Sequence, residues 1–224
     1  MTRPPAARAL DGAALLLLAL PGAASAATLA PVKPCYVSVT SATREAVDVA
    51  GAGFTPSSKV DVSVDGAVAL AGAQVDPAGN LPAQVLQAPY HAKGERAFTI
   101  TATEQGNPAS TATLTPRVTA LNLGIQPRRA RPSRRILFRG RGFTGAGNVY
   151  AHYLFGGRVR KTVSFGRAKG PCGTFTVRRR QIPIRSPRTG RWLLRVDQQK
   201  RYSETPASVF VRVAIDVSRV FRLR

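Results

Sequence analysis

Residues 51–66 read GAGFTPSSKVDVSVDG and indicate the fold more directly than any other part of the sequence. This stretch opens with a G-x-G-F-T element, after which three valines alternate with polar residues up to an Asp-Gly turn. Alternation with a period of two is the pattern of a strand that buries one face. The two glycines permit a positive φ at a bulge or turn. We expect the large apolar side chain that follows them, Phe54, to plug the end of a packed core. The element does not indicate a nucleotide-binding loop, since no helical pattern follows it.

Three further stretches alternate in the same way: 98–102 (FTITA), 192–197 (WLLRVD) and 209–215 (VFVRVAI). In the second of these, Arg195 and Asp197 are expected on the solvated face of a strand. No long stretch repeats apolar residues at helical spacing, and the valine, threonine, glycine and proline content favours strands joined by tight turns. The sequence therefore predicts an all-β fold of the sandwich type.

The opening stretch has a second copy at residues 140–157, GRGFTGAGNVYAHYLFGG, 89 residues further along the chain. This offset is about the length of one immunoglobulin-sized unit. Two more features recur in the same order. Residues 94–100 correspond to residues 190–196, and the turn at 76–80 corresponds to 169–173. The sequence thus predicts two tandem immunoglobulin-like β-sandwich domains, at 27–118 and at 119–224, joined near residues 116–123.

These motifs resemble the immunoglobulin-like repeats of secreted actinobacterial proteins. The resemblance rests on residues 51–56, 60–66, 76–80 and 94–102, which follow the repeat's pattern of GxGFTPG, an alternating strand with a D-G turn, DxxGN and a final alternating strand. It is close in the first domain and looser in the second. It implies a fold but no activity, because the motifs are structural turns. Residues 142–173 depart from the pattern through aromatic residues and arginines, so we expect any specific binding in the second domain.

The first 26 residues have the pattern of a signal peptide: the positive residues Arg3 and Arg8, the apolar core 13–20 (AALLLLAL) and the small residues 24–26. An apolar run this short cannot span a bilayer, which needs roughly 20 residues, and no later segment is apolar enough. The alternative for this segment is a buried N-terminal helix. We expect a secreted, extracellular protein without a transmembrane segment, with the cell wall as a candidate place of retention.

Positive charge is confined to the second domain. Residues 121–224 contain 25 lysines and arginines against three acidic residues, whereas residues 1–120 contain eight of each kind. The guanidinium group presents a planar fork of five donors that suits phosphate and carboxylate groups. The candidate polyanion-binding residues come from two runs of arginine: Arg128, Arg129, Arg131, Arg134, Arg135, Arg178, Arg179 and Arg180.

The expected partner is an anionic cell-wall polymer or an acidic polysaccharide, bound with strong salt dependence. Sequence-specific nucleic-acid binding is not expected, because no helix-turn-helix, zinc-finger or RNP pattern appears. Tyr153 and Phe155, which share one strand face near several arginines, are expected in the core rather than on a stacking platform. The alternative is a ligand-free extracellular scaffold whose charge serves solubility or loose wall retention, in a genome that encodes arginine readily. Against it, the first domain holds only Arg44, Arg96 and Arg117 after residue 26.

Residues suited to catalysis or metal binding are sparse. The two histidines, His91 and His152, lack neighbouring cysteine, histidine or acidic residues at metal-ligand spacing. In the second domain, Asp197 and Glu204 are too few for a confident carboxylate pair of the glycosidase kind. No nucleophile elbow or zinc-binding helix motif occurs. We therefore expect a non-enzymatic protein without a cofactor or a metal.

The only two cysteines are Cys35 and Cys172. In an oxidising compartment a lone pair usually forms a disulfide, and closing a 137-residue separation would stabilise the fold by roughly 5 kcal/mol. However, Cys35 opens the first domain, near the end expected to point away from the second. A disulfide would then require the two domains to lie side by side. Free or intermolecular cysteines are the alternative, and the sequence leaves the oligomeric state open.

Overall fold

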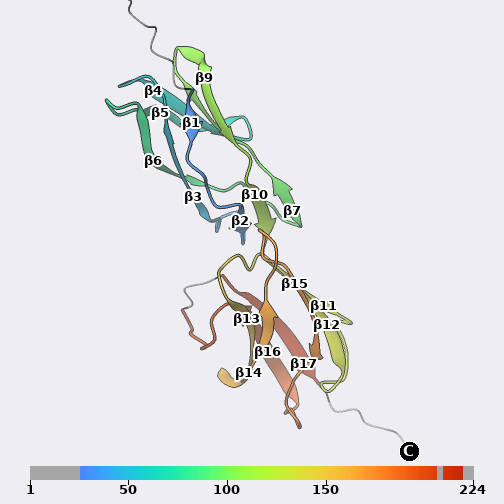
Figure 1. Cartoon of the computed structure of the whole chain (residues 1–224). Coiled ribbons are helices and arrows are strands. Elements are labelled where there is room, and N and C mark those ends of the chain that lie inside the picture. Colours follow the sequence, from blue (N-terminus) through green and yellow to red (C-terminus); the bar gives the residue numbers. More distant parts are fainter. Residues whose placement is uncertain (1–25, 206–208, 219–224) are drawn as a thin grey trace, which may run out of the picture.

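The computed structural model describes residues 26–205 and 209–218, whose strands form β-sandwiches around two separate hydrophobic cores (Figure 1). The residues around the first core and those around the second are called the first and the second domain below. Each sandwich packs a three-stranded sheet on a four-stranded sheet, so the predicted all-β fold is confirmed. The predicted signal peptide lies outside the described residues except for Ala26. Within the described ranges, no helix combines the length and the hydropathy that crossing a membrane would require.

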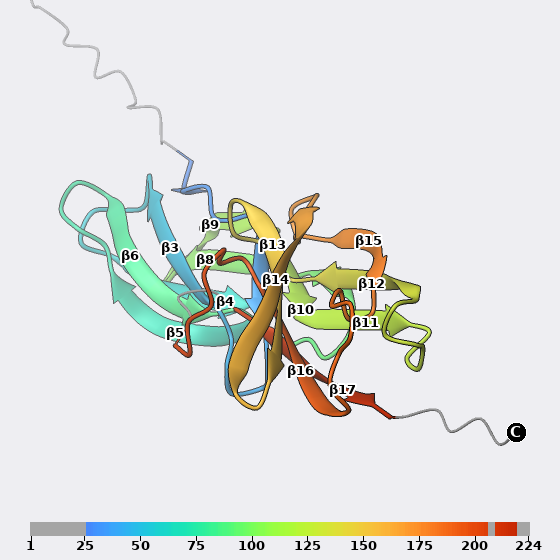
Figure 2. The same cartoon turned by 90° about the horizontal axis from the view of Figure 1, so that it is seen from below.

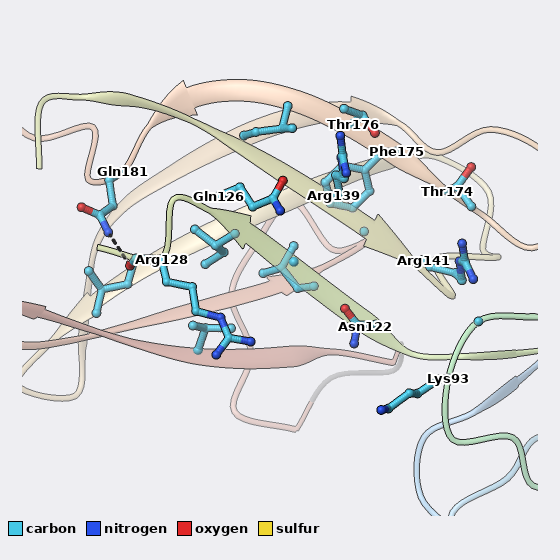
Figure 3. Close-up of a pocket in the computed structure, with 18 of the residues that line it drawn as sticks. Lys93, Asn122, Gln126, Arg128, Arg139, Arg141, Thr174, Phe175, Thr176 and Gln181 are labelled. Atoms are coloured by element: carbon cyan, nitrogen blue, oxygen red, sulfur yellow. Dashed lines mark hydrogen bonds between the residues drawn. The ribbon is translucent and has the colours of Figure 1, made fainter. Parts of the chain in front are cut away.

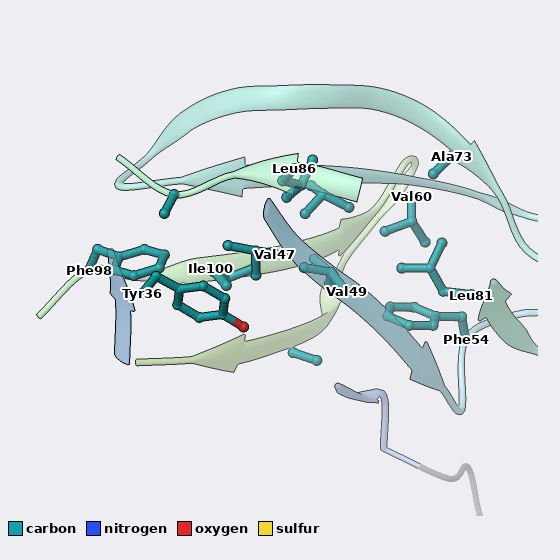
Figure 4. Close-up of a cluster of buried hydrophobic side chains, with 14 of the residues drawn as sticks. Tyr36, Val47, Val49, Phe54, Val60, Ala73, Leu81, Leu86, Phe98 and Ile100 are labelled. Carbon is teal, nitrogen blue, oxygen red and sulfur yellow. The ribbon is translucent and has the colours of Figure 1, made fainter. Parts of the chain in front are cut away.

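The first domain has one sheet of order β1-β3-β6 and a second of order β5-β4-β8-β9. Their strands are β1 (Thr28–Leu29), β3 (Ala46–Ala52), β4 (Lys59–Val64), β5 (Ala67–Gln74), β6 (Asn80–Gln87), β8 (Ile100–Glu104) and β9 (Asn107–Leu114). Val60, predicted from the alternation to be buried, packs between these sheets with Val49, Leu81 and Ile100 (Figure 4). Val62, predicted in the same way, belongs to the same core.

A small third sheet lies at the end of the first domain that meets the second (Figure 1). It has the order β2-β10-β7 and consists of β2 (Cys35–Ser38), β7 (Glu95–Ala97) and β10 (Arg117–Ala120). The strands β2 and β10 run parallel, with Cys35 opposite Arg117. This pairing brings the start of the first domain beside the strand that leads into the second.

The second domain repeats the plan, with one sheet of order β11-β12-β15 and one of order β14-β13-β16-β17. Its strands are β11 (Asn122–Gln126), β12 (Arg135–Arg141), β13 (Asn148–Phe155), β14 (Arg158–Arg167), β15 (Phe175–Arg180), β16 (Gly190–Asp197) and β17 (Val211–Val217). A separate core contains Phe138, Tyr153, Trp192 and Leu194. The expectation that Tyr153 belongs to the core is confirmed, whereas Phe155 is only half-buried at its margin.

The two G-x-G-F elements act as predicted. Gly53 and Gly142 have φ values of 83° and 88°, and the phenylalanine that follows each is buried. The backbone N–H of Phe54 donates to the carbonyl oxygen of Gly79 at 3.1 Å. Phe143 makes the same contact with Gly173, also at 3.1 Å. Each plug is therefore fixed by a glycine in the turn that precedes the last strand of the three-stranded sheet.

The predicted alignment of 94–100 with 190–196 is wrong by two residues. Val62 pairs with Ala102, and Ala151, the counterpart of Val62, pairs with Val196. Ala102 therefore corresponds to Val196, an offset of 94 residues rather than 96. Because side chains alternate with a period of two, a slip of two residues leaves every assigned face unchanged and is invisible to the alternation.

The domains meet end to end in Figure 1, and the view from below in Figure 2 shows the first domain displaced to one side of the second. The strand β10 ends at Ala120 and β11 begins at Asn122. Leu121 is the one residue between these two strands, and the expected domain boundary between residues 118 and 119 lies within the bounds of β10 and stays a prediction.

A disulfide joins Cys35 to Cys172 across this joint, with their Cα atoms 5.1 Å apart. The expectation that it requires side-by-side domains is wrong. The parallel pairing of β2 with β10 puts Cys35 at the end that faces the second domain, where the turn containing Cys172 lies. The ammonium group of Lys33 also donates to Thr144 Oγ1 at 3.0 Å, so the joint has covalent and polar contacts.

Candidate functional site

Strand pairing brings the two predicted runs of arginine together. In β12 and β15, Arg135 lies opposite Arg180, and Leu137 lies opposite Arg178. Side chains alternate between the two faces of a strand, so Arg135, Arg178 and Arg180 point outward and are exposed. Along β12 the same outward side carries Arg139, which is exposed, and Arg141, which is half-buried. We call these five arginines, on the outer side of the β11-β12-β15 sheet, the basic face.

The other predicted residues are placed differently. Arg128, Arg129, Arg131 and Arg134 are exposed in the loop between β11 and β12, beside one end of the basic face. Arg179 is half-buried because its position in β15 points inward, and its Nη1 donates to the carbonyl oxygen of Arg178 at 3.1 Å. It therefore does not belong to the basic face, and its predicted role in polyanion binding stays a prediction.

A groove of about 850 Å³ borders the joint side of the basic face, and it is lined by residues of β11, β12 and β15, by Lys93 and Gly94 of the first domain and by residues 213–215 of β17 (Figure 3). Of the five face arginines, Arg139 and Arg141 line it. Its charged lining residues are Lys93, Arg128, Arg139 and Arg141. The side chain of Arg141 reaches toward the first domain. Its Nη1 lies next to Gly94, where a Cβ atom added to the glycine would be 3.3 Å from it. Neither Lys93 nor the pair Arg139 and Arg141 was among the predicted site residues. Lys93 could not be found from charge runs, since it belongs to the first domain.

The charge of this surface is not neutralised locally. The strands β11, β12 and β15 contain no acidic residue, and within residues 26–205 and 209–218 none of the five face arginines makes an ion pair. One guanidinium, that of Arg135, donates to the carbonyl oxygen of Arg178 at 3.3 Å. Exposed like charges without partners raise the local concentration of anions, so the arrangement suits a linear polyanion.

A second polar cluster lies on the outer side of the other sheet, where the sequence predicted a solvated face. Arg195 and Asp197 are fully buried, as is His152. The described residues 198–205 and 209–210 of the connection between β16 and β17 cover them. The guanidinium of Arg195 lies 4.8 Å from the ring centre of Tyr202 and 4.6 Å from that of Phe210. We call these covering residues the strap and the three buried residues the strap cluster.

Hydrogen bonds tie the strap to the sheet. Arg195 Nε donates to Asp197 Oδ2 at 3.0 Å, and the backbone N–H of Gln199 donates to Asp197 Oδ1 at 2.8 Å. His152 Nε2 lies 3.3 Å from Asp197 Oδ1 and 3.0 Å from the carbonyl oxygen of Gln199. Both of these neighbours are acceptors, so Nε2 carries the proton. Burial alone would raise the pKa of Asp197, but the hydrogen bonds from His152 and Gln199 and the nearby positive charges outweigh it and lower that pKa.

Together with Thr162, the strap cluster forms a hydroxyl–imidazole–carboxylate series, because Thr162 Oγ1 lies 3.0 Å from His152 Nδ1. The second oxygen of Asp197 is occupied by Arg195, and the imidazole proton is shared with a backbone carbonyl. Such a network fastens the strap to the sheet. In the described part of the chain, no group of three histidine, cysteine or acidic residues is arranged to hold a metal ion.

No protein-family model matches the chain, and no curated protein matches its sequence. Among solved structures, the chain is similar to bovine butyrophilin, with a TM-score of 0.30 and 9% identity over 86% of this chain and 99% of that one. It is also similar to a tetra-tandem repeat from the extending region of a large adhesion protein, with a TM-score of 0.29 and 14% identity. A third similarity is to the extracellular cadherin domains 1–4 of protocadherin gamma B7, with a TM-score of 0.24 and 11% identity. The chain covers 50% and 49% of the last two.

Proposed function

We propose that this protein is a secreted, non-enzymatic binding module of the cell envelope whose second domain attaches to an anionic cell-wall polymer or acidic polysaccharide. The basic face is the attachment surface. The observation that carries the proposal is the register of β12 and β15, which sets Arg135 directly opposite Arg180 and Leu137 opposite Arg178.

The geometry of the sheet suits a repeating ligand. Neighbouring strands lie about 4.8 Å apart, and alternate residues along one strand lie roughly 6.6 Å apart. The five arginines of the basic face therefore form a two-dimensional array rather than a single cluster. A polymer with many anionic groups can contact several of them at once, and each additional contact forms at a high effective concentration. An isolated anion gains no such advantage.

The test compares two fourfold variants of the full chain on a heparin matrix. Replacing Arg135, Arg139, Arg178 and Arg180 with serine removes four charges from the basic face. The matched control replaces Arg158, Lys161, Arg167 and Lys169 with serine, which removes four exposed charges from β14 and the turn after it. We expect the face variant to elute at much lower salt. The slope of log affinity against log salt should fall by about 3, since each lost contact removes roughly 0.7–0.9.

The control variant should keep most of the wild-type salt slope. Equal losses in both variants would mean that net charge, and not the basic face, determines retention. Retention that does not respond to salt would contradict the proposal outright, and the ligand-free scaffold would then be the better description.

A further inference from the structure

A small cavity lies at the end of the second domain remote from the joint, away from the groove of the basic face. Its volume is about 260 Å³, and it is lined by Phe155, Arg160, Ile184, Ser186, Arg188 and Trp192. Four elements meet there: the end of β13, the start of β14 with Arg160, the segment between β15 and β16, and the start of β16 with Trp192. None of these residues belongs to the predicted polyanion-binding set.

The floor of the cavity is apolar and fixed. Phe155 lies opposite Trp192 in the pairing of β13 with β16, and their ring centres are 5.0 Å apart at an interplanar angle of 42°. The indole N–H of Trp192 donates to the carbonyl oxygen of Arg188 at 2.9 Å. This bond satisfies the indole and holds the backbone of Arg188 at the rim. Polar recognition is thus left to the two arginines and Ser186.

The rim is cationic and lacks a compensating acid. Arg160 and Arg188 are exposed, and within the described residues neither makes an ion pair. At the corresponding turn of the first domain, Asp65 Oδ2 lies 2.8 Å from Arg96 Nη2. The first domain therefore closes this corner with an internal ion pair, whereas the second leaves two guanidinium groups beside an apolar floor.

This combination selects a class of ligand. Pockets for drug-sized ligands measure about 300–1,000 Å³, so a cavity of about 260 Å³ suits a single small ring. Guanidinium groups bind carboxylates in a planar, two-bond geometry, and the face of a sugar ring provides C–H surface that packs on aromatic side chains. A phosphodiester would satisfy the arginines but leave the apolar floor uncovered.

We propose that the cavity binds one carboxylate-bearing pyranose, a hexuronate unit of an acidic polysaccharide, with its ring over Phe155 and its carboxylate between Arg160 and Arg188. The assignment deepens the proposed function, on which it rests for the polymer, by naming the sugar class. The binding of a free monosaccharide is a separate property, because one carboxylate cannot span the basic face.

Trp192 is the only tryptophan of the chain, so intrinsic tryptophan fluorescence reports on the surroundings of this one residue, which lines the cavity. The full chain is titrated with sodium glucuronate, with glucose and with inorganic phosphate at constant ionic strength. We expect a saturable change in emission with glucuronate, a response at least tenfold weaker with glucose, and none with phosphate. The variant R160Q/R188Q should weaken glucuronate binding at least tenfold, while the neighbouring control R158Q/R191Q should bind like the wild type.

The emission maximum of each unliganded variant verifies that the core around Trp192 is intact. No saturable response to glucuronate, an equal response to phosphate, or equal weakening in both double variants would overturn the assignment. Retention of the wild type on heparin despite a failed glucuronate titration would leave the basic face standing and remove only this cavity. Loss of both would remove the proposed function as well.

Discussion

The two domains share one framework and differ in what they present outward. In the three-stranded sheet of the first domain, Ala46 lies opposite Gln87, and Asp48 lies opposite Val85. The equivalent pairs in the second domain are Arg135 with Arg180 and Leu137 with Arg178. Most inward residues of both sheets are apolar, and the exceptions are Gln84, which lies opposite Val49, and Arg179, both of which are half-buried. The inward pattern therefore specifies the sandwich and leaves the outward positions free to differ between the two domains.

The second difference is the connection between the last two strands of each four-stranded sheet. In the first domain only Gln105 and Gly106 separate β8 from β9, and the neighbouring outward residues Thr101 and Thr103 are partly exposed. In the second domain the strap takes this place, and the equivalent residues Arg195 and Asp197 are buried beneath it. A longer loop has thus converted a solvated sheet face into a second, polar interior.

The largest expected effect comes from removing the disulfide in the variant C35S/C172S. When the first domain of the oxidised protein unfolds, its chain is still tied to the second domain at Cys172 and at Leu121. The loop-entropy relation gives about 4–5 kcal/mol for a closed segment of this length. We expect the variant to unfold at lower denaturant, with two separate transitions. Trp192 emission follows the second domain, and far-ultraviolet circular dichroism follows both.

Reduction of the wild type should reproduce the behaviour of this variant, which controls for the serine side chains. Unchanged denaturation midpoints would show that the disulfide does not stabilise either domain against unfolding.

A smaller effect is expected from D197N, which leaves Arg195 buried without its carboxylate partner. Removing one partner of a buried ion pair typically costs about 3–5 kcal/mol. The matched change in the first domain, T103N, alters a partly exposed position and should cost no more than about 0.5 kcal/mol. Urea unfolding followed by Trp192 emission measures the first variant, and circular dichroism measures the second.

The ion pair of Asp197 with Arg195 should also make the free energy of unfolding depend on pH. The pKa of Asp197 is lower in the folded chain than its ordinary value, so its contribution to the free energy of unfolding is complete above about pH 5 and is lost as the pH falls through the folded pKa. The difference in stability between wild type and D197N should therefore shrink below about pH 4. A difference that stays constant down to pH 2 would contradict the assignment of the strap cluster.

The smallest effect concerns the two glycines that fix the phenylalanine plugs. A Cβ atom at Gly173 would lie 2.1 Å from the carbonyl oxygen of Phe143, and one at Gly79 would lie 2.7 Å from that of Phe54. Both residues have positive φ, so each alanine variant should lose about 1–3 kcal/mol, with G173A the more destabilised. Thermal denaturation compares them with G66A, which has positive φ and open space around it. Equal losses of stability in all three variants would show that the positive φ, and not the contact with the phenylalanine carbonyl, accounts for the destabilisation.

Much of the fold was predictable because its signal is local. The alternation in 59–65 and the two G-x-G-F elements depend on neighbouring residues, and they predicted the sandwiches and their repetition. The parallel pairing of Cys35 with Arg117 could not be predicted in the same way, since it joins residues far apart in the chain. The wrong expectation about the disulfide came from that missing contact.

The candidate sites show the same limit. The arginine runs at 128–135 and 178–180 were visible in the sequence, but only the register between β12 and β15 separates the outward Arg178 and Arg180 from the inward Arg179. The burial of Arg195 depends on the strap, whose residues carry no period that predicts where it folds. Alternation identifies which side of a strand a residue faces, and it does not say what covers that side.

The disulfide across the joint also determines how the chain would carry a pulling force. The shortest covalent path from Ala26 to Ser218 passes from Cys35 to Cys172, so residues 36–171 lie outside the loaded path. Fully extended, the loaded segments 26–35 and 172–218 span roughly 190–200 Å, against roughly 640–690 Å for the whole of 26–218. Most of the first domain would bear no tension. The oxidised protein would therefore act as a short tether that yields little length before its covalent bonds are loaded.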